Sequence, residues 1–373
     1  MKDVSEYRKI FPHLEKHTWL NHASISPIST RVQAKIDEFT QIRQTGSIDN
    51  FAENLSKLEQ FRTQVGKLIN SPEDRIALTH NTSEGFILLA SGLEWKKGDR
   101  ILLNDIEFPA NVYPFLQLKK QGVEIDFVKS KDGRITVEDL EKAISPRTKI
   151  LSISFVNFRY GFRPDLEKIG ELCRSKGVIF SVDGIQGIGA VPIDVQKCKI
   201  DFLSCACHKW LMALQGTAFV YLTKELQDKI HSPLTGWLSV KHFWDFFNYD
   251  EENLFDSARR FEFGTYNFMG VWAALESISI LNEFRIENIW ERLQFFAKML
   301  REGIEAKGYA IKSPYETISE TSGITSFQAK NGEEILERCK KAGTTIVMRE
   351  NFIRVSPHFY NTEDEIQKLL KLL

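Results

Sequence analysis

The chain has 373 residues, of which 42% are hydrophobic and 27% are charged, as in an ordinary globular protein with a buried core. Its 49 basic and 50 acidic residues leave a net charge of −1, which gives no support for a nucleic-acid or membrane partner. The five cysteines are irregularly spaced, which argues against a disulfide framework. Residues 1–20 are charged throughout and lack the apolar core of a signal peptide, and no apolar run approaches a membrane span, so we expect a cytoplasmic protein.

Short apolar runs alternate with helical patterns from about residue 74 onward. Several of the runs are apolar on both faces, as in a sheet covered on both sides, and we expect strands at Arg75–Thr79, Arg100–Asn104, Glu124–Lys129, Lys149–Val156, Val178–Val182, Ile200–Cys207 and Thr217–Leu222. Helices are expected between them at Ser83–Leu93, Pro109–Gln121, Thr136–Ile144 and Pro164–Lys176. This alternation predicts an α/β domain with a mostly parallel sheet.

The pattern changes after about residue 268. Two long helical stretches, Phe268–Phe284 and Arg285–Lys307, are followed by short strands and a further helix over Gly332–Ala342. Thr362 and Glu365 form a capping box at the head of a last helix. We therefore expect a large domain over residues 16–282 and a smaller α+β domain made of residues 1–15 and 283–373.

An acid and an amine follow two of the expected strands. Asp183 ends the run Val178–Val182, and His208 and Lys209 come directly after Ile200–Cys207. Because the carboxyl ends of parallel strands meet at the edge where ligands bind, the acid and the amine are expected to share one cleft. Pyridoxal phosphate (PLP) chemistry needs both groups, a lysine for the Schiff base and an acid for the pyridinium nitrogen. Each residue alone is more often a solvated loop residue or a helix cap, so the pair carries the prediction.

The arrangement Asp183-x-x-Gln186-x-x-Gly189, followed by His208-Lys209-Trp210, resembles the class V aminotransferase family. The resemblance covers nearly the whole chain, from residues 20–23 to residues 354–362. This family comprises fold-type I PLP enzymes, among them cysteine desulfurases, kynureninase and isopenicillin N epimerase. The resemblance implies the fold-type I architecture, PLP as the cofactor and an α-amino acid or a close relative as the substrate.

The family pattern transfers to individual residues. Lys209 matches the Schiff-base lysine, Asp183 matches the acid at the pyridine nitrogen, and Gln186 matches the residue that bonds the phenolic oxygen of the cofactor. His208 is included in the expected cofactor site. Arg354 matches the arginine that binds the substrate α-carboxylate through a bidentate pair.

The resemblance assigns the rest of the cofactor site to three segments. Thr82 and Ser83 match the phosphate-binding turn, where a strand leads into a helix whose free N–H groups face the phosphate, although the same residues alone would make an ordinary helix cap. Phe108 matches the residue that stacks on the PLP ring, a position where cysteine desulfurases usually carry histidine. Gly264 and Thr265 match a motif whose threonine reaches the phosphate in the partner subunit, so a homodimer is implied.

Three features depart from the family pattern or imitate another one. Ala206 stands where the family often has a serine that bonds the phosphate. Cys205 and Cys207 beside His208 imitate a metal cluster, but no second Cys/His pair appears at zinc spacing, so we expect no metal. The glycines of Gly184-x-x-Gly187-x-Gly189 do not have the spacing of a dinucleotide-binding motif, which disfavours a nicotinamide enzyme.

The segment Thr344–Ile353 bears on the reaction. Cysteine desulfurases carry a sulfur-accepting cysteine on a loop shortly before the carboxylate arginine, whereas this segment holds none and the nearest cysteine, Cys339, falls in a helical pattern. A persulfide mechanism is therefore disfavoured, and amino transfer or an epimerase-like proton exchange are the leading predictions. The alternatives are a kynureninase-like lyase, a cysteine or selenocysteine lyase without a persulfide, and a non-catalytic fold relative. Further candidates for shaping substrate choice are Phe158, Arg159, Tyr160, Arg163, His22 and Trp237.

Overall fold

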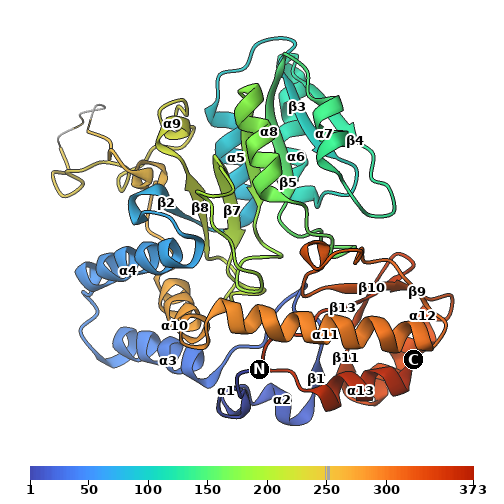
Figure 1. Ribbon diagram of the computed structural model, residues 1–373. Helices are drawn as coiled ribbons and strands as arrows, with labels where there is room; N and C mark the ends of the chain where they lie inside the picture. The colour runs from blue at the N-terminus through green and yellow to red at the C-terminus, as the bar shows by residue number, and fades with distance from the viewer. Residues whose placement is uncertain (248, 250–252) are drawn as a thin grey trace.

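The computed structural model describes residues 1–247, 249 and 253–373. Its centre is a seven-stranded sheet with the strand order β2-β8-β7-β6-β5-β3-β4 (Figure 1). The strands from β3 to β7 run parallel, and only β8 runs antiparallel to its two neighbours, β2 and β7, so the expected α/β fold with a mostly parallel sheet is confirmed. The bounds are β2 (Ile76–Thr79), β3 (Arg100–Asn104), β4 (Glu124–Val128), β5 (Thr148–Ser154), β6 (Ile179–Asp183), β7 (Phe202–Ala206) and β8 (Ala218–Leu222).

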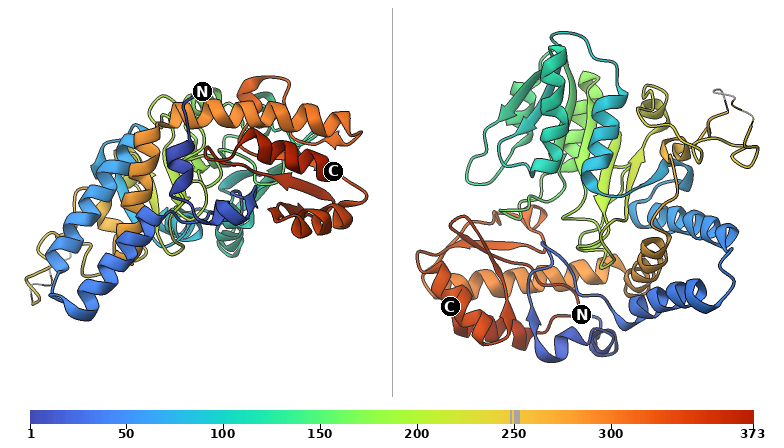
Figure 2. Two further views of the ribbon diagram at one scale, coloured as in Figure 1. Left: turned by 90° about the horizontal axis from the view of Figure 1, so that it is seen from below. Right: turned by 180° about the vertical axis from the view of Figure 1, so that it is seen from behind.

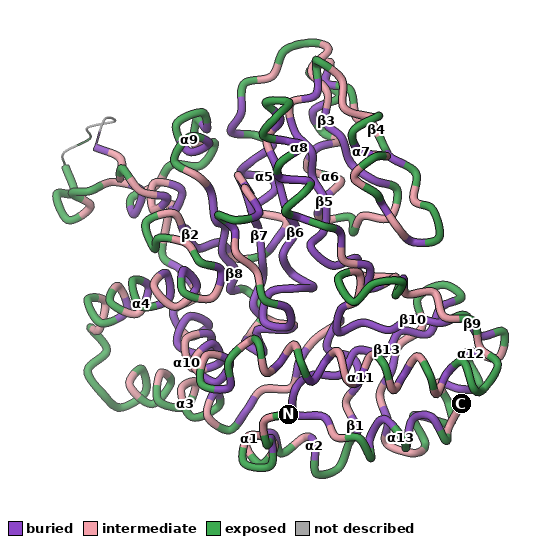
Figure 3. Tube along the Cα trace, viewed as in Figure 1, coloured by how far each residue is buried: buried purple, intermediate pink, exposed green. Residues whose placement is uncertain are grey.

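Alternate residues along the strands bury opposite faces of this sheet. Ile101 and Leu103 of β3 belong to one hydrophobic cluster and Leu102 to the other, as expected when successive side chains point to opposite sides. The first cluster is closed by α5 (Thr82–Gly92) and α6 (Tyr113–Leu116). The second is closed by helices α4 (Phe51–Ile69), α7 (Val137–Ala143), α8 (Leu166–Lys176) and α10 (Phe268–Phe284). The sheet is thus covered on both sides, and its strands are mostly buried except for the edge strand β4, which is largely exposed or half-buried (Figure 3).

A second, four-stranded antiparallel sheet lies in the C-terminal part of the chain, with the order β12-β13-β10-β9. Its strands are β9 (Ala310–Ile311), β10 (Thr325–Gln328), β12 (Val347–Arg349) and β13 (Phe352–Val355). The long helix α11 (Ile286–Ala306) packs against it, together with α12 (Gly332–Lys341) and α13 (Glu363–Leu372). The predicted capping box at Thr362 and Glu365 is present at the start of α13.

The N-terminal segment lies beside this C-terminal part (Figures 1 and 2). The short strand β1 (Thr18–Trp19) pairs with β11 (Thr344–Thr345), and Arg8 in α1 (Ser5–Lys9) forms an ion pair of 2.9 Å with Glu365. The helix α2 (His13–Lys16) lies between them in the chain. The division into residues 16–282 and two flanking segments stays a prediction.

Two stretches differ from the sequence expectation. The helix expected over Pro109–Gln121 is broken into the 3₁₀ helix η2 (Pro109–Asn111), α6 and the 3₁₀ helix η3 (Gln117–Gln121), because Pro114 has no N–H group to continue an α-helix. No element was expected between residues 24 and 70, where α3 (Thr30–Thr45) and α4 lie and pack against α10. In the described part of the chain, no helix is both long and apolar enough to cross a membrane.

Candidate active site

A cavity of about 350 Å³ opens where β6 and β7 end. β6 and β7 pair in parallel with Asp183 opposite Ser204, so the acid at the end of β6 and the lysine in the turn after β7 reach the same edge. The cavity brings together most of the residues predicted from the sequence, namely Thr82, Ser83, Phe108, Asp183, Gln186, His208, Lys209 and Arg354. Gly264 and Thr265 do not line it.

Lys209 is the buried amine of this cavity. Burial lowers the pKa of its side chain to about 8, although the nearby Asp183 acts in the opposite direction. Its Nζ atom lies 5.6 Å from the centre of the Phe108 ring. A lysine with a pKa this close to neutral has a substantial unprotonated fraction, which is what a nucleophilic amine requires.

Asp183 is buried, with only 2% of its surface exposed. Burial raises the pKa of its carboxyl group to about 7, opposed by one hydrogen bond of 3.0 Å from the backbone N–H of Ile185. A carboxylate held in this way gains from any cation brought against it. The protonated ring nitrogen of PLP would supply such a charge, so this residue fits its predicted role.

Gln186 is held by two hydrogen bonds. The indole Nε1 of Trp210 donates to its Oε1 at 2.9 Å, and its own Nε2 donates to the carbonyl oxygen of Ala23 at 3.0 Å. An indole can only donate and a carbonyl can only accept, so the two contacts fix which way round the amide lies. One N–H of the amide remains to donate to a group in the cavity, such as the phenolic oxygen of the cofactor.

The start of α5, which was predicted to bind the cofactor phosphate, lies at the cavity. The side chain of Asn81 caps the helix by accepting from the N–H of Glu84, and the Thr82 hydroxyl oxygen is buried without a hydrogen-bond partner. Free N–H groups and the positive end of the helix dipole favour an anion here. A Cβ atom on Gly85 would lie 2.3 Å from Oγ of Ser204, so glycine is needed for the helix to approach β7 closely.

Phe108 stands at the open side of the cavity and packs edge-to-face on Phe158 at 5.1 Å. The preceding residue, Glu107, anchors the loop. Its carboxylate accepts hydrogen bonds from the side chains of Asn104 and Asn111 at 2.6 and 3.0 Å and from Ser154, whose N–H and hydroxyl donate at 2.9 and 2.6 Å. The role of Glu107 could not be predicted from the sequence, because its partners come from three separate segments.

Arg354 projects from β13 into the cavity and is buried. Its Nη1 donates to the carbonyl oxygen of Phe158 at 2.7 Å and its Nη2 to Oγ of Ser24 at 2.8 Å, while its Nε is buried without a partner. Burial lowers the pKa of the guanidinium to about 10, and the nearby Arg349 acts in the same direction. A buried, partly unsatisfied guanidinium of this kind suits an incoming carboxylate.

His208 and Ala206 complete the wall next to Lys209. Burial lowers the pKa of His208 to about 4, with a further contribution from Lys209, so this imidazole is neutral at pH 7. Ala206 offers no hydroxyl group to a phosphate, whereas Thr82 and Ser83 also line the cavity and carry one each.

Thr265 is exposed and lies outside the cavity of its own chain. The loop before it is tied down by Glu262, whose buried carboxylate pairs with the buried Arg62 and accepts from the N–H of Leu78 at 2.9 Å. Its predicted role toward a partner subunit remains a prediction.

The other candidates for substrate choice are dispersed. Phe158 lines the cavity, and Arg159 forms an ion pair of 2.6 Å with Glu350. His22 is buried against Tyr360, behind the cavity wall. Arg163 bonds to the carbonyl oxygens of Ile318 and Thr321, and Trp237 stacks on Phe51 away from the cavity.

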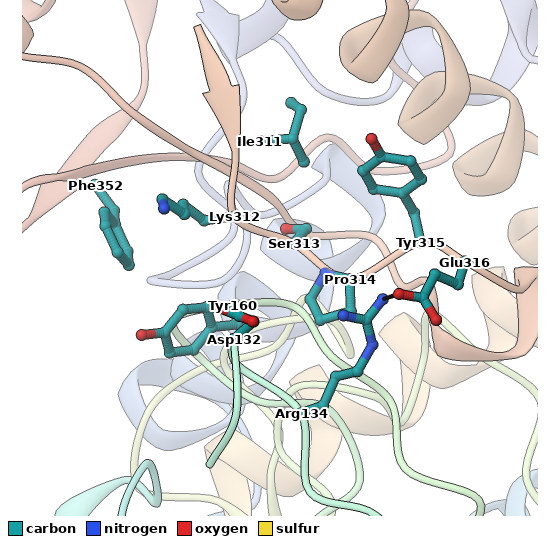
Figure 4. Close-up of a pocket in the computed structure, with 10 residues that line it drawn as sticks. All are labelled: Asp132, Arg134, Tyr160, Ile311, Lys312, Ser313, Pro314, Tyr315, Glu316 and Phe352. Atoms are coloured by element: carbon teal, nitrogen blue, oxygen red, sulfur yellow. Dashed lines mark ion pairs between the residues drawn. The ribbon is translucent and has the colours of Figure 1, made fainter.

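Tyr160 belongs to a separate cavity of about 390 Å³ between the segments 132–134 and 311–316 (Figure 4). Two of the charged residues that line it, Arg134 and Glu316, form an ion pair of 2.9 Å with one another. Neither Lys209 nor Asp183 reaches it. The chemistry-bearing residues therefore gather in the cavity at the end of β6 and β7.

The cysteines do not reach the cavity. All five are buried, and none lines the cavity. Burial raises the pKa of both Cys205 and Cys207, which makes them poor thiolates. Over residues 1–247, 249 and 253–373, no group of three or more His, Cys, Asp or Glu side chains is arranged to hold a metal ion.

Comparison with known proteins settles the family. The family model described as aminotransferase class-V matches residues 18–369. The chain belongs to the class V aminotransferase family. The fold is that of the fold-type I PLP enzymes, and the protein is a PLP-dependent enzyme.

Two relatives illustrate the range of the class V family. An uncharacterized aminotransferase, YcbU of Bacillus subtilis (strain 168), is 29% identical over 368 residues, which is 97% of this chain and 95% of that protein. A probable cysteine desulfurase of Pyrococcus abyssi (strain GE5 / Orsay) is 28% identical over 401 residues, or 100% of this chain and 97% of that protein.

Two solved structures show the same class V fold. The apo cysteine desulfurase of Thermococcus onnurineus NA1 has a TM-score of 0.90 at 23% identity and covers 100% of this chain and 97% of its own. The cysteine desulfurase CsdA of Escherichia coli has a TM-score of 0.88 at 20% identity, covering 100% and 98%. At these identities the likeness shows the fold, and the reaction has to be argued from the site.

Proposed function

We propose that this class V enzyme acts on an α-amino acid and moves its α-proton, with amino transfer or epimerase-like exchange as the leading reactions. The observation that carries the proposal is the arrangement of Lys209, Asp183 and Arg354 around one cavity. PLP, when bound, supplies an electron sink for the carbanion left when a bond at the α-carbon breaks.

Arg354, Lys209 and Asp183 each have a separate role in the proposed reaction. Arg354 binds the α-carboxylate and so orients the α-carbon in the cavity. Lys209 holds the cofactor and, once displaced by the substrate amine, accepts the α-proton at Nζ and returns it. A pKa near 8 suits both steps, because a base that is close to half-protonated at the working pH exchanges protons most effectively. Asp183 keeps the ring nitrogen protonated.

A lyase reaction is the second candidate, and it is favoured by the names of the relatives. Several of them are probable cysteine desulfurases. In this chain Cys339 is buried in α12, and none of the described cysteines lines the cavity. Turnover of cysteine or selenocysteine would therefore proceed by direct elimination. A non-catalytic relative would have little use for the buried Lys209 and Asp183 together.

The experiment is to incubate the purified holoenzyme with single amino acids in D₂O. We expect loss of the α-proton NMR signal for the accepted substrate, with 2-oxo acid formed in amino transfer and inverted enantiomer in epimerisation. Release of sulfide from cysteine without a protein-bound persulfide would identify the lyase. Exchange that persists undiminished in Lys209→Ala would overturn the proposal.

We also infer that the protein is a cytoplasmic homodimer. Support for the dimer comes from an exposed aromatic segment that includes Trp244, Phe246 and Phe247, since large exposed apolar patches mark interaction surfaces. This segment is tied to the loop that carries Thr265, because the Ser239 hydroxyl donates to the carbonyl oxygen of Glu262 at 3.0 Å. The same surface would then bring Thr265 to the phosphate site of the second copy.

A further inference from the structure

A second arginine lines the active-site cavity beside Arg354. In the antiparallel pair of β12 and β13, Arg354 is opposite Val347 and Arg349 is opposite Phe352. Residues two apart on a strand share a face, so Arg349 and Arg354 are diagonal neighbours on one face of this hairpin. Both side chains line the cavity that also holds Lys209.

The neighbouring acid does not neutralise Arg349. Glu350 follows it in the hairpin turn with a left-handed backbone, φ 53°, and forms an ion pair of 2.6 Å with Arg159. Arg159 in turn lies over the ring of Phe352 at 4.5 Å. Within the part of the chain that the structure describes, Arg349 itself has no ion pair, and it is exposed at the open side of the cavity.

The proposed chemistry gives Arg349 no role, because other residues serve each charged group of the cofactor and substrate. Among the described residues that line the cavity, Asp183 is the only acid, and the proposal assigns it to the ring nitrogen. In the proposal, the start of α5 binds the cofactor phosphate, and Arg354 binds the substrate α-carboxylate. Among the described lining residues, Arg349 is therefore the cation that has no partner in the proposed chemistry, and it lies at the open side of the cavity.

We propose that Arg349 binds an anionic group on the substrate side chain, so that the substrate is an acidic α-amino acid. The inference rests on the proposed function, since it takes the α-carboxylate to be at Arg354. It narrows the substrate to amino acids whose side chain carries a carboxylate or a group of similar charge. A neutral side chain of the same size would leave the Arg349 guanidinium facing it without a counter-charge.

The test compares isosteric pairs that differ only in charge. The absorbance of the cofactor in the holoenzyme is titrated with aspartate against asparagine and with glutamate against glutamine. The expected result is a midpoint about tenfold or more lower for the better of the two acids than for its amide, as one charge-assisted hydrogen bond gives. Arg349→Gln should abolish this preference while leaving the asparagine and glutamine midpoints unchanged, and Arg349→Lys should keep part of it.

Two matched variants separate this role from a general charge effect. Lys312→Gln removes a cation from the neighbouring cavity of Figure 4 and should leave the preference intact. Arg354→Lys should weaken acid and amide alike, because it damages the shared α-carboxylate site. Equal midpoints for acid and amide in the unaltered protein, or equal losses for both in Arg349→Gln, would overturn the inference while leaving the proposed function standing.

A second readout does not depend on reaction with the cofactor. Succinate carries two carboxylates and no amine, and butyrate carries one. Succinate should raise the melting temperature of the holoenzyme more than butyrate does, and Arg349→Gln should remove the difference. If no amino acid perturbs the absorbance or exchanges its α-proton, the proposed function fails. If succinate and butyrate raise the melting temperature equally, the result counts against Arg349 alone.

Discussion

At the scale of single residues, the indole of Trp210 fixes the orientation of the Gln186 amide. Trp210→Phe keeps an aromatic six-membered ring but removes the five-membered ring with the N–H that donates to Oε1. The amide is then free to turn, so its remaining N–H no longer faces the cavity consistently. We expect PLP affinity to fall about fivefold, from the loss of about 1 kcal/mol, and the pH at which the bound cofactor changes its absorbance to shift.

A matched control for Trp210→Phe is Trp19→Phe. Trp19 also donates through Nε1, to the carbonyl oxygen of Ile25 at 3.0 Å, but it does not line the cavity. Because Trp19 is only partly buried whereas Trp210 is fully buried, Trp19→Phe should lower stability less than Trp210→Phe, and it should leave the absorbance titration unchanged. An equal titration shift in both variants would show that the Trp210 effect is only structural.

In the protein without PLP, the buried carboxylate of Asp183 should lower the stability of the folded state. Its folded pKa is raised to about 7 from 3.8, so the folded state binds more protons than the unfolded state between these values, and its stability falls as pH rises through this window. Asp183→Asn keeps an acceptor for the Ile185 N–H and removes the charge. Its apo form should therefore melt higher than the unaltered apo form at pH 7.5 and no higher at pH 4.

Addition of PLP should reverse the order of the melting temperatures of Asp183→Asn and the unaltered protein. The protonated ring nitrogen stabilises the Asp183 carboxylate but gives nothing to an amide, so the gain in melting temperature on PLP binding should be larger for the unaltered protein. Equal gains in both proteins would contradict the pairing of Asp183 with the ring nitrogen.

The residues that the sequence could predict are those whose position along the chain is itself informative. Asp183 and Lys209 end consecutive apolar runs, and parallel pairing brings such ends together. Trp210, Glu107 and Arg349 act through partners far away in the chain, so their roles depend on contacts that no short pattern records. For Arg349 there was still a signal, since it lies five residues before Arg354 at the far side of a two-residue turn.

At the scale of elements, strands were predicted more accurately than helices. Every strand of the seven-stranded sheet lies within two residues of its expected bounds. All of them except the edge strand β4 are mostly buried, and strands buried on both faces are read as apolar runs. The helix α4 was not predicted, although Leu58, Phe61, Val65 and Ile69 recur at helical spacing and are buried. α3 has only Val32 buried, so its pattern alone gives little signal.

The loop that carries Thr265 depends on a buried ion pair between elements. Arg62 of α4 and Glu262 are both almost fully buried, and Glu262 also accepts from β2 through the N–H of Leu78. Glu262→Gln leaves the Arg62 charge without its buried partner. We expect a loss of about 3–5 kcal/mol in the free energy of unfolding, measured by urea denaturation.

Glu59 provides the control for this pair. It contacts the same guanidinium at 2.9 Å, but half of its side chain is exposed. Glu59→Gln should therefore cost less than about 1 kcal/mol. A similar small loss in Glu262→Gln would mean that Arg62 is adequately solvated or paired without Glu262.

At the scale of the whole molecule, the proposed homodimer would account for two exposed features, the aromatic segment and the Thr265 loop. Phe247 has 87% of its surface exposed, and Trp244 and Phe246 have 57% and 59%. An isologous interface would bury the patch on both copies at once. We expect a dimer in sedimentation, and Phe247→Asp should weaken it and lower PLP retention together, because a ligand that contacts both chains stabilises only the assembled state.

Mixing two inactive variants tests whether the dimer shares its active sites. Lys209→Ala removes the amine from one cavity, and a bulky Thr265→Tyr should obstruct the phosphate site of the partner. In a heterodimer both defects fall in a single site, and the other site keeps Lys209 from one chain and Thr265 from the other. Mixing should then restore up to half of the activity per heterodimer. Absence of recovery despite verified subunit exchange would contradict the shared site, as would a fully active, PLP-loaded monomer.

A Lys209→Ala and Asp183→Asn mixture serves as the control, because both defects act within their own chain and each heterodimer site would remain defective.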